Sequence, residues 1–184
     1  MAMSAFFYGT LMHPKVLKRV IKNDGSHLEI CPAVLLDYTR HKVKNAEYPG
    51  VIPYAEGRLL CRRELDVEEK SVRGTLVIGL TERDIQFLDY FEGSEYTREG
   101  IDVHPLDSLV NLNEYDKDDE SLIPSKPPAL PTPEELATPV KAEAYVYKYF
   151  TRLEAELWSF EEFVKKDAQK WYGPQKEDGD VRWA

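Results

Sequence analysis

Short apolar runs of strand length recur along the whole chain and alternate with a few segments of helical periodicity. In chain order, these runs lie at 5–8, 30–37 with 38–44 as a continuation, 51–54, 58–61, 72–79, 96–104 and 142–150. Helical periodicity begins at Pro14, whose fixed φ suits a first turn, and at Glu82, which follows the capping residue Thr81. Because strands and helices alternate without a tandem repeat, the 184 residues predict a single domain of mixed α and β structure.

Two later segments depart from this pattern of strands. Residues 106–141 are first acidic and then rich in proline, and half of the 12 prolines of the chain lie in the second half of this segment. Such a composition cannot build a core, so we expect a flexible insertion exposed to water. The Pro-x-x-Pro spacing of Pro124 and Pro127 leaves open that the insertion docks onto a protein partner. Apolar residues at helical spacing predict a last helix at about 159–172, within one domain that extends over 1–184.

Charge and residue usage exclude several classes of protein. The chain has 24 basic and 33 acidic side chains, a net charge of −9, which is the wrong sign for binding nucleic acid. It contains no apolar run of the roughly 18 residues that a membrane-spanning helix needs. The N-terminus lacks the pattern of a secretory signal, so we expect a cytoplasmic protein that binds neither nucleic acid nor membrane. The 2 cysteines and 4 histidines show no ligand spacing, which predicts neither a disulfide framework nor a metal site.

The first candidate for a binding site is the segment that follows the first apolar run. Tyr8-Gly9-Thr10-Leu11-Met12 joins a predicted strand to the helix that begins at Pro14. A glycine there allows close approach of a ligand to the backbone, and successive amides at the turn suit an anion or a carbonyl oxygen. A turn that uses glycine only for its geometry explains the same residues. The neighbouring His13 fits either the edge of a site or an exposed turn.

The second candidate is Glu92, which lies at the predicted end of the helix that begins at Glu82. Gly93 follows it and is typical of a helix cap. The negative end of the helix dipole raises the pKa of a carboxyl group at this place, and shielding by apolar neighbours such as Phe91 would raise it further. A general base that works near neutral pH needs such a shift. A solvated surface glutamate is the alternative interpretation.

The order of several short motifs resembles the γ-glutamylcyclotransferase-like superfamily, and within it the AIG2-like branch. In chain order, these motifs are Phe7-Tyr8-Gly9-Thr10-Leu11, Tyr48-Pro49-Gly50, Val72-Arg73-Gly74, Leu88-Asp89-x-x-Glu92-Gly93-x-x-Tyr96-x-Arg98, Tyr145-Val146-Tyr147 and Trp158-x-x-Glu161-x-Phe163. Apart from 106–141, the resemblance covers nearly the whole chain.

The resemblance implies a fold, a reaction and the residues of a site. The implied fold is a small mixed β-barrel flanked by helices, with a cavity between the Tyr-Gly-Thr-Leu turn and an acidic residue. The implied catalytic proton acceptor is Glu92, and nothing is assigned to Glu95. The residues implied to bind a small γ-glutamyl substrate, largely through backbone groups, are Tyr8, Gly9, Thr10, Leu11, Met12 and His13. No metal and no organic cofactor is implied.

The implied reaction releases 5-oxoproline and a free amine from a γ-glutamyl amine or peptide. The α-amino group of the substrate attacks its own γ-carbonyl carbon, so the protein supplies no nucleophile. That amino group has a pKa of about 8 and must first lose a proton, which Glu92 can accept and later return to the leaving amine. Two alternatives stay open: a non-catalytic ligand-binding or interaction protein on the same fold, and an acyltransferase that uses an external amine.

Overall fold

The computed structural model describes residues 2–115 and 129–158, which form nine strands, three α-helices and four short 3-10 turns. The strands are β1 (Met3–Phe7), β2 (Glu29–Leu36), β3 (Tyr38–Val43), β4 (Pro49–Pro53), β5 (Ser71–Leu80), β6 (Tyr96–Pro105), β7 (Val110–Asn111), β8 (Val140–Tyr147) and β9 (Leu153–Leu157). The helices are α1 (Pro14–Ile21), α2 (Tyr54–Cys61) and α3 (Glu82–Glu92). The 3-10 turns are η1 (Thr10–Met12), η2 (Gly93–Glu95), η3 (Leu112–Tyr115) and η4 (Phe150–Arg152).

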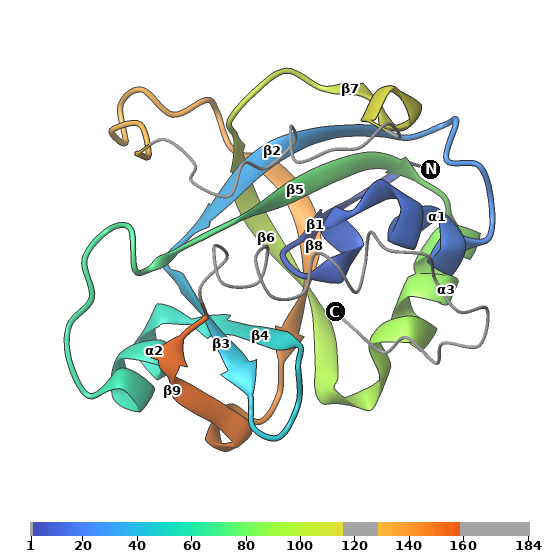
Figure 1. Ribbon diagram of the computed structural model, residues 1–184. Coiled ribbons are helices and arrows are strands. Elements are labelled where there is room, and N and C mark those ends of the chain that lie inside the picture. The colour runs from blue at the N-terminus through green and yellow to red at the C-terminus, as the bar shows by residue number, and fades with distance from the viewer. Residues whose placement is uncertain (1, 116–128, 159–184) are drawn as a thin grey trace.

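Five of the strands close into a ring. β1 pairs with β5, β5 with β2, β2 with β6, and β6 with β8, and β8 returns to β1 through a parallel contact of Ala5 with Glu143. The parallel β4 extends the sheet from β8, and β3 and β9 follow it outward. The expected small mixed β-barrel with flanking helices is therefore confirmed (Figure 1).

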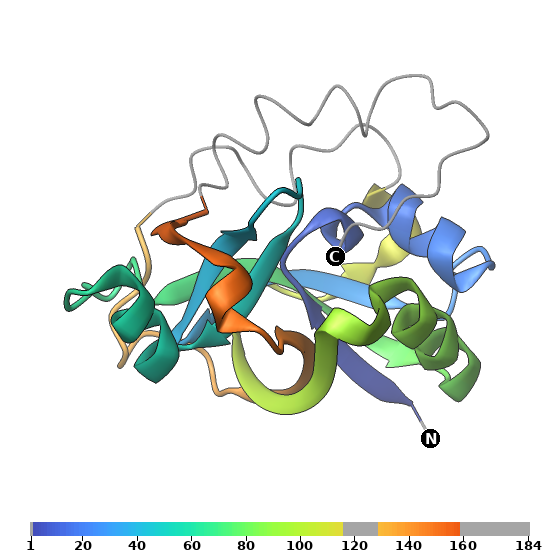
Figure 2. The ribbon, with the colours of Figure 1, turned by 90° about the horizontal axis from the view of Figure 1, so that it is seen from below.

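Alternate residues of the ring strands separate the two parts of the core. Phe6 belongs to the cluster that fills the ring, whereas its neighbours Ala5 and Phe7 belong to the second cluster, which also contains helix residues. The ring cluster includes Cys31, Ala33, Leu35, Val72, Leu76, Ile101, Val103, Ala142 and Ala144. The second cluster includes Leu17, Ile21, Ile30, Val77, Ile85 and Leu88. Helices α1 and α3 thus pack side by side over the outer face of the ring (Figures 1 and 2).

Residues 58–61 are helical, and the sequence-based prediction of a strand there is wrong. They form the second half of α2, where Leu60 packs against the core while Leu59 is 70% exposed. A run of four residues is too short for its periodicity to distinguish a helix from a strand. Helix α2 and β9 lie at the opposite end of the molecule from α1 and α3 (Figure 2).

The continuous strand expected over 30–44 is divided in two. Asp37 adopts a left-handed conformation with φ 63°, and the chain turns there from β2 into β3. The two strands consequently belong to different parts of the sheet: β2 lies in the ring and β3 lies in the extension beside β4.

The beginning of the 106–141 segment contributes to the core, which corrects the expectation of an exposed insertion for that part. β7 pairs with β2, and the Leu112 amide donates to the Leu28 carbonyl at 3.0 Å. Leu112 is fully buried, so one apolar side chain anchors this segment against α1. At the other end, β8 begins at Val140. The predicted helix at 159–172 lies outside the described residues.

Two glycines of the sequence motifs allow close approach of the chain to its neighbours. A Cβ atom built on Gly74 would lie 2.1 Å from the Phe7 carbonyl oxygen, where β1 pairs with β5. A Cβ atom on Gly50 would lie 2.8 Å from Cβ of Tyr147. Real Cβ atoms do not tolerate such contacts, so both positions require glycine for packing reasons.

We expect Gly74→Ala to lower the free energy of unfolding by about 1–3 kcal/mol, because a backbone carbonyl cannot move aside for the added methyl group. Urea unfolding followed by circular dichroism measures this change. Gly100→Ala is the matched control, since nothing lies within 4 Å of a Cβ at Gly100. Equal unfolding midpoints for the two variants would contradict the packing argument.

Candidate active site

The local sequence of α3 places Glu92 on the buried face of the helix. Thr81 and Asp84 form a capping box, in which the Thr81 hydroxyl accepts from the Asp84 amide at 3.1 Å and the Asp84 carboxylate accepts from the Thr81 amide at 3.0 Å. Glu92 comes one turn after the fully buried Leu88, so its side chain projects to the same side. The Gly93 amide donates to the Asp89 carbonyl and ends the helix as predicted.

The carboxyl group of Glu92 is withdrawn from water. The residue is only 9% exposed, and its Oε2 atom is buried without a hydrogen-bond partner among the described residues. Burial raises the pKa of Glu92 well above its ordinary value, and the negative charge of Asp89 raises it further. The helix dipole acts in the same direction. The structure thus rules out a solvated surface glutamate at this position.

Tyr8 lies beside Glu92 at the end of β1. The Tyr8 hydroxyl donates to the Tyr145 carbonyl at 2.5 Å, and the Arg40 guanidinium donates to the Tyr8 carbonyl at 2.9 Å. Burial raises the pKa of Tyr8 well above its ordinary value, and the negative charge of Glu92 adds to the shift. The structure therefore brings together two of the residues that the sequence singled out, although 84 positions separate them in the chain.

Two further tyrosines surround Glu92, and sequence reasoning gave them no role. The Tyr96 hydroxyl donates to the Pro49 carbonyl at 2.9 Å, and the Tyr145 hydroxyl donates to the Asp89 carboxylate at 2.8 Å. Burial is the main cause of a raised pKa in both tyrosines, and the charge of Glu92 contributes to both shifts. The sequence pointed to these two tyrosines only because both stand in the motifs that resemble the γ-glutamylcyclotransferase-like superfamily.

The hydroxyl groups of the three tyrosines described around Glu92 donate to other groups. Tyr8, Tyr96 and Tyr145 donate to two backbone carbonyls and to Asp89. A hydrogen bond donated to a carboxylate stabilises its charged form and lowers its pKa. Because these three hydroxyls donate to other groups, they do not offset the effect of burial, which raises the pKa of Glu92.

Residues Thr10–Met12 form the buried turn η1, and Gly9 precedes it as the cap. Its bonds run from the Met12 amide to the Gly9 carbonyl at 3.1 Å and from the His13 amide to the Thr10 carbonyl at 3.0 Å. Thr10, Leu11 and Met12 are buried. His13 is the cap of α1, since its Nδ1 atom accepts from the Lys15 amide at 3.1 Å. This capping gives His13 a structural role in addition to the predicted contact with substrate.

The described part of the chain lacks two further kinds of feature, a cluster of metal ligands and a membrane-spanning helix. Within residues 2–115 and 129–158, no group of three or more histidine, cysteine, aspartate or glutamate side chains is arranged to hold a metal ion. No helix there has the length and apolar character needed to cross a membrane.

Two solved structures share the fold of this chain. A solution structure of an Arabidopsis thaliana protein matches with a TM-score of 0.57 at 21% identity, over 94% of this chain and 78% of that one. A second Arabidopsis solution structure matches with a TM-score of 0.55 at 18% identity, over 95% of both chains. At these identities the likeness shows a shared fold.

The sequence then shows the family. The family described as "Gamma-glutamyl cyclotransferase, AIG2-like" matches residues 5–165, so the chain belongs to that family. Among curated relatives, AIG2-like protein C of Arabidopsis thaliana is 28% identical over 111 residues, which are 60% of this chain and 55% of the relative. AIG2-like protein D of the same plant is 30% identical over 105 residues, which are 57% of this chain and 59% of the relative. The match spans little more than half the length of these relatives.

We expect Glu92→Gln to stabilise the protein at neutral and alkaline pH. The folded-state pKa of Glu92 is raised, so ionisation of this group costs stability as pH rises from the unfolded pKa through the folded pKa. Glutamine removes that cost, and the free energy of unfolding should increase by about 1 kcal/mol or more above the raised pKa. The gain should vanish at pH values where Glu92 is protonated in both states.

Urea unfolding at a series of pH values measures this gain. Glu82→Gln is the matched control at the exposed start of the same helix, where loss of a favourable charge should destabilise by about 0.5 kcal/mol at neutral pH. A Glu92→Gln protein that is less stable than the unmodified chain at pH 8 would show that the carboxylate is well solvated or paired.

Proposed function

We propose that this chain catalyses γ-glutamyl cyclotransfer, releasing 5-oxoproline and a free amine from a γ-glutamyl amine or peptide. The single observation that carries the proposal is the buried Glu92 with a raised pKa, in a chain of the γ-glutamyl cyclotransferase, AIG2-like family. A base of this kind is what the reaction requires from the protein.

The proton balance of the reaction assigns Glu92 two successive roles. The substrate binds with its α-amino group as an ammonium ion, which cannot attack a carbonyl carbon. Glu92 accepts one proton from it, and the freed nitrogen forms a bond to the γ-carbonyl carbon. The bond from that carbon to the leaving nitrogen then breaks, while protonated Glu92 donates its proton to the leaving nitrogen. The ring nitrogen gives its remaining extra proton to the regenerated Glu92 carboxylate, and this proton departs with the released amine, which leaves as an ammonium ion. A raised pKa of Glu92 brings the two partners of each transfer closer in proton affinity.

The turn after β1 supports the remaining part of the proposal. We assign the γ-glutamyl group to Tyr8 and to the turn from Gly9 to Met12, with His13 at its edge. Amides of residues 9–11 would stabilise the negative charge that develops on the γ-carbonyl oxygen, a contribution of about 3 kcal/mol per donor in other acyl transfers. The burial of this turn favours strong hydrogen bonds there, because water does not compete.

We expect Glu92→Gln to reduce the rate of 5-oxoproline release by roughly 10²–10⁴-fold, the usual contribution of a positioned proton acceptor. Mass spectrometry of the products measures 5-oxoproline directly. The substrates are glutathione, a series of γ-glutamyl amino acids and a γ-glutamyl isopeptide. Glu82→Gln carries the same substitution on the same helix outside the site and should retain full activity.

Two results would overturn the proposal. If the unmodified chain releases no 5-oxoproline from any of these compounds, a non-catalytic ligand-binding role replaces it. If Glu92→Gln matches the unmodified chain, the proton acceptor is another group. A product whose mass equals a γ-glutamyl group joined to an added amine would indicate transfer to an external acceptor instead of cyclisation.

We expect Asp89→Asn to shift the acid limb of the pH–rate profile to lower pH. Asp89 raises the pKa of Glu92 through its negative charge, and asparagine removes that charge while it can still accept the Tyr145 hydroxyl. Arg98, which pairs with Asp89 at 3.1 Å, keeps its second partner Glu143 at 3.2 Å. Kinetic measurement over a pH series tests this. Glu99→Gln, an exposed change on β6, should leave the profile in place.

A further inference from the structure

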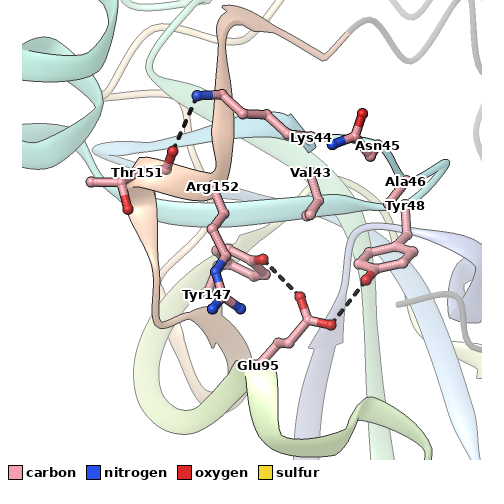
Figure 3. A pocket seen from close by; sticks show the side chains of 9 residues that line it. All are labelled: Val43, Lys44, Asn45, Ala46, Tyr48, Glu95, Tyr147, Thr151 and Arg152. Carbon is pink, nitrogen blue, oxygen red and sulfur yellow. Dashed lines mark hydrogen bonds between the residues drawn. The ribbon is translucent and has the colours of Figure 1, made fainter.

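A second polar pocket lies next to the end of α3, between the β3–β4 turn and the β8–η4 connection (Figure 3). Its volume is about 380 Å³, which falls within the range of small-molecule sites. The charged and hydrogen-bonding side chains on its walls include Lys44, Asn45, Tyr48, Glu95, Tyr147 and Arg152. Neither Glu92 nor the turn at residues 9–13 lines it, so this pocket is separate from the site proposed above.

The carboxylate of Glu95 is held at one wall by two tyrosines. The Tyr48 hydroxyl donates to Oε1 at 2.9 Å and the Tyr147 hydroxyl donates to Oε2 at 2.7 Å, from opposite sides of the group (Figure 3). Both donors are neutral, so the hydrogen bonds fix the orientation of the carboxylate without neutralising its negative charge. Burial is the main cause of the raised pKa of Tyr147, and the hydrogen bond to Glu95 and the negative charge of Glu95 raise it further.

Positive charge occupies another wall of the same pocket. The Arg152 guanidinium lies over the Tyr149 ring at 4.5 Å, and its charge lowers the pKa of Tyr147, opposite to the effect of Glu95. In the part of the chain that the structure describes, no ion pair joins Arg152 or Lys44 to a carboxylate. Lys44 is oriented by a hydrogen bond from its Nζ atom to the Thr151 carbonyl at 3.2 Å.

The Glu95 carboxylate and the cationic groups of Arg152 and Lys44 therefore line one pocket without forming an ion pair with each other. A ligand that carried only a negative charge would meet Glu95, and one that carried only a positive charge would meet Arg152 and Lys44. A small zwitterion satisfies both walls through charge-assisted hydrogen bonds. We propose that this pocket binds a free α-amino acid, with its ammonium group on Glu95 and its carboxylate on Arg152 and Lys44.

Isothermal titration calorimetry with three probes tests the proposal on the full chain. L-alanine carries both charges, N-acetyl-L-alanine lacks the ammonium, and L-alaninamide lacks the carboxylate. We expect saturable binding of L-alanine that is roughly tenfold or more tighter than binding of either derivative, because each lost ion contact is a charged hydrogen bond. The assay measures binding alone, so its outcome does not depend on turnover at Glu92.

Two variants test which charged group of the ligand contacts which wall of the pocket. Glu95→Gln should weaken L-alanine binding by roughly tenfold and abolish the preference over N-acetyl-L-alanine. Arg152→Gln, a change at an exposed position, should abolish the preference over L-alaninamide. Glu99→Gln is the matched control, since Glu99 lies on β6 outside the pocket and should leave all three affinities unchanged.

Three outcomes would overturn the inference. The first is the absence of saturable L-alanine binding to the unmodified chain. The second is equal binding of the three probes, which would show that the charges make no contact with the ligand. The third is unchanged affinity in Arg152→Gln, a variant whose urea unfolding curve will show whether it is folded.

Discussion

Strand β8 pairs with three other strands, and the candidate site depends on that pairing. It closes the ring between β6 and β1 and continues the sheet to β4. The alternation of its side chains places Ala142 and Ala144 inside the ring, where space is limited. Tyr145 and Tyr147 point to the other face, and each hydroxyl donates to a carboxylate near the end of α3. The strand that completes the barrel thus also provides the walls around Glu92 and Glu95.

Burial without compensation is the main electrostatic property of the candidate active site. A buried carboxyl group normally receives donors, because an unpaired charge is costly away from water. At Glu92 the neighbouring tyrosines direct their hydroxyl protons to Tyr145, Pro49 and Asp89 instead. Ionisation of the buried Glu92 therefore lowers the stability of the folded state, and the pKa of this carboxyl group is raised. Glu95, three residues later, shows the opposite arrangement, with one tyrosine donor on each oxygen.

Sequence periodicity predicted the features that depend on near neighbours in the chain. The start of α3 at its Thr81 cap, its end at Gly93 and the strand over 72–79 are confirmed, and the strand expected over 142–150 ends earlier, at Tyr147. Two of the errors share one cause. Residues 58–61, and Leu112 within an otherwise polar segment, carry short patterns whose structure is decided by distant packing partners. Strand β9 was not predicted, because it forms only by pairing with β3.

The sequence by itself determined that Glu92 ends a helix, since capping and periodicity act over a few residues. It also determined the family, through the order of its motifs. Only the tertiary structure decided that Tyr8 and Tyr145 enclose that glutamate, and that Tyr48, Glu95 and Arg152 border one pocket. Desolvation and charge interaction depend on distance in space, and that distance follows from strand pairing between segments far apart in the chain.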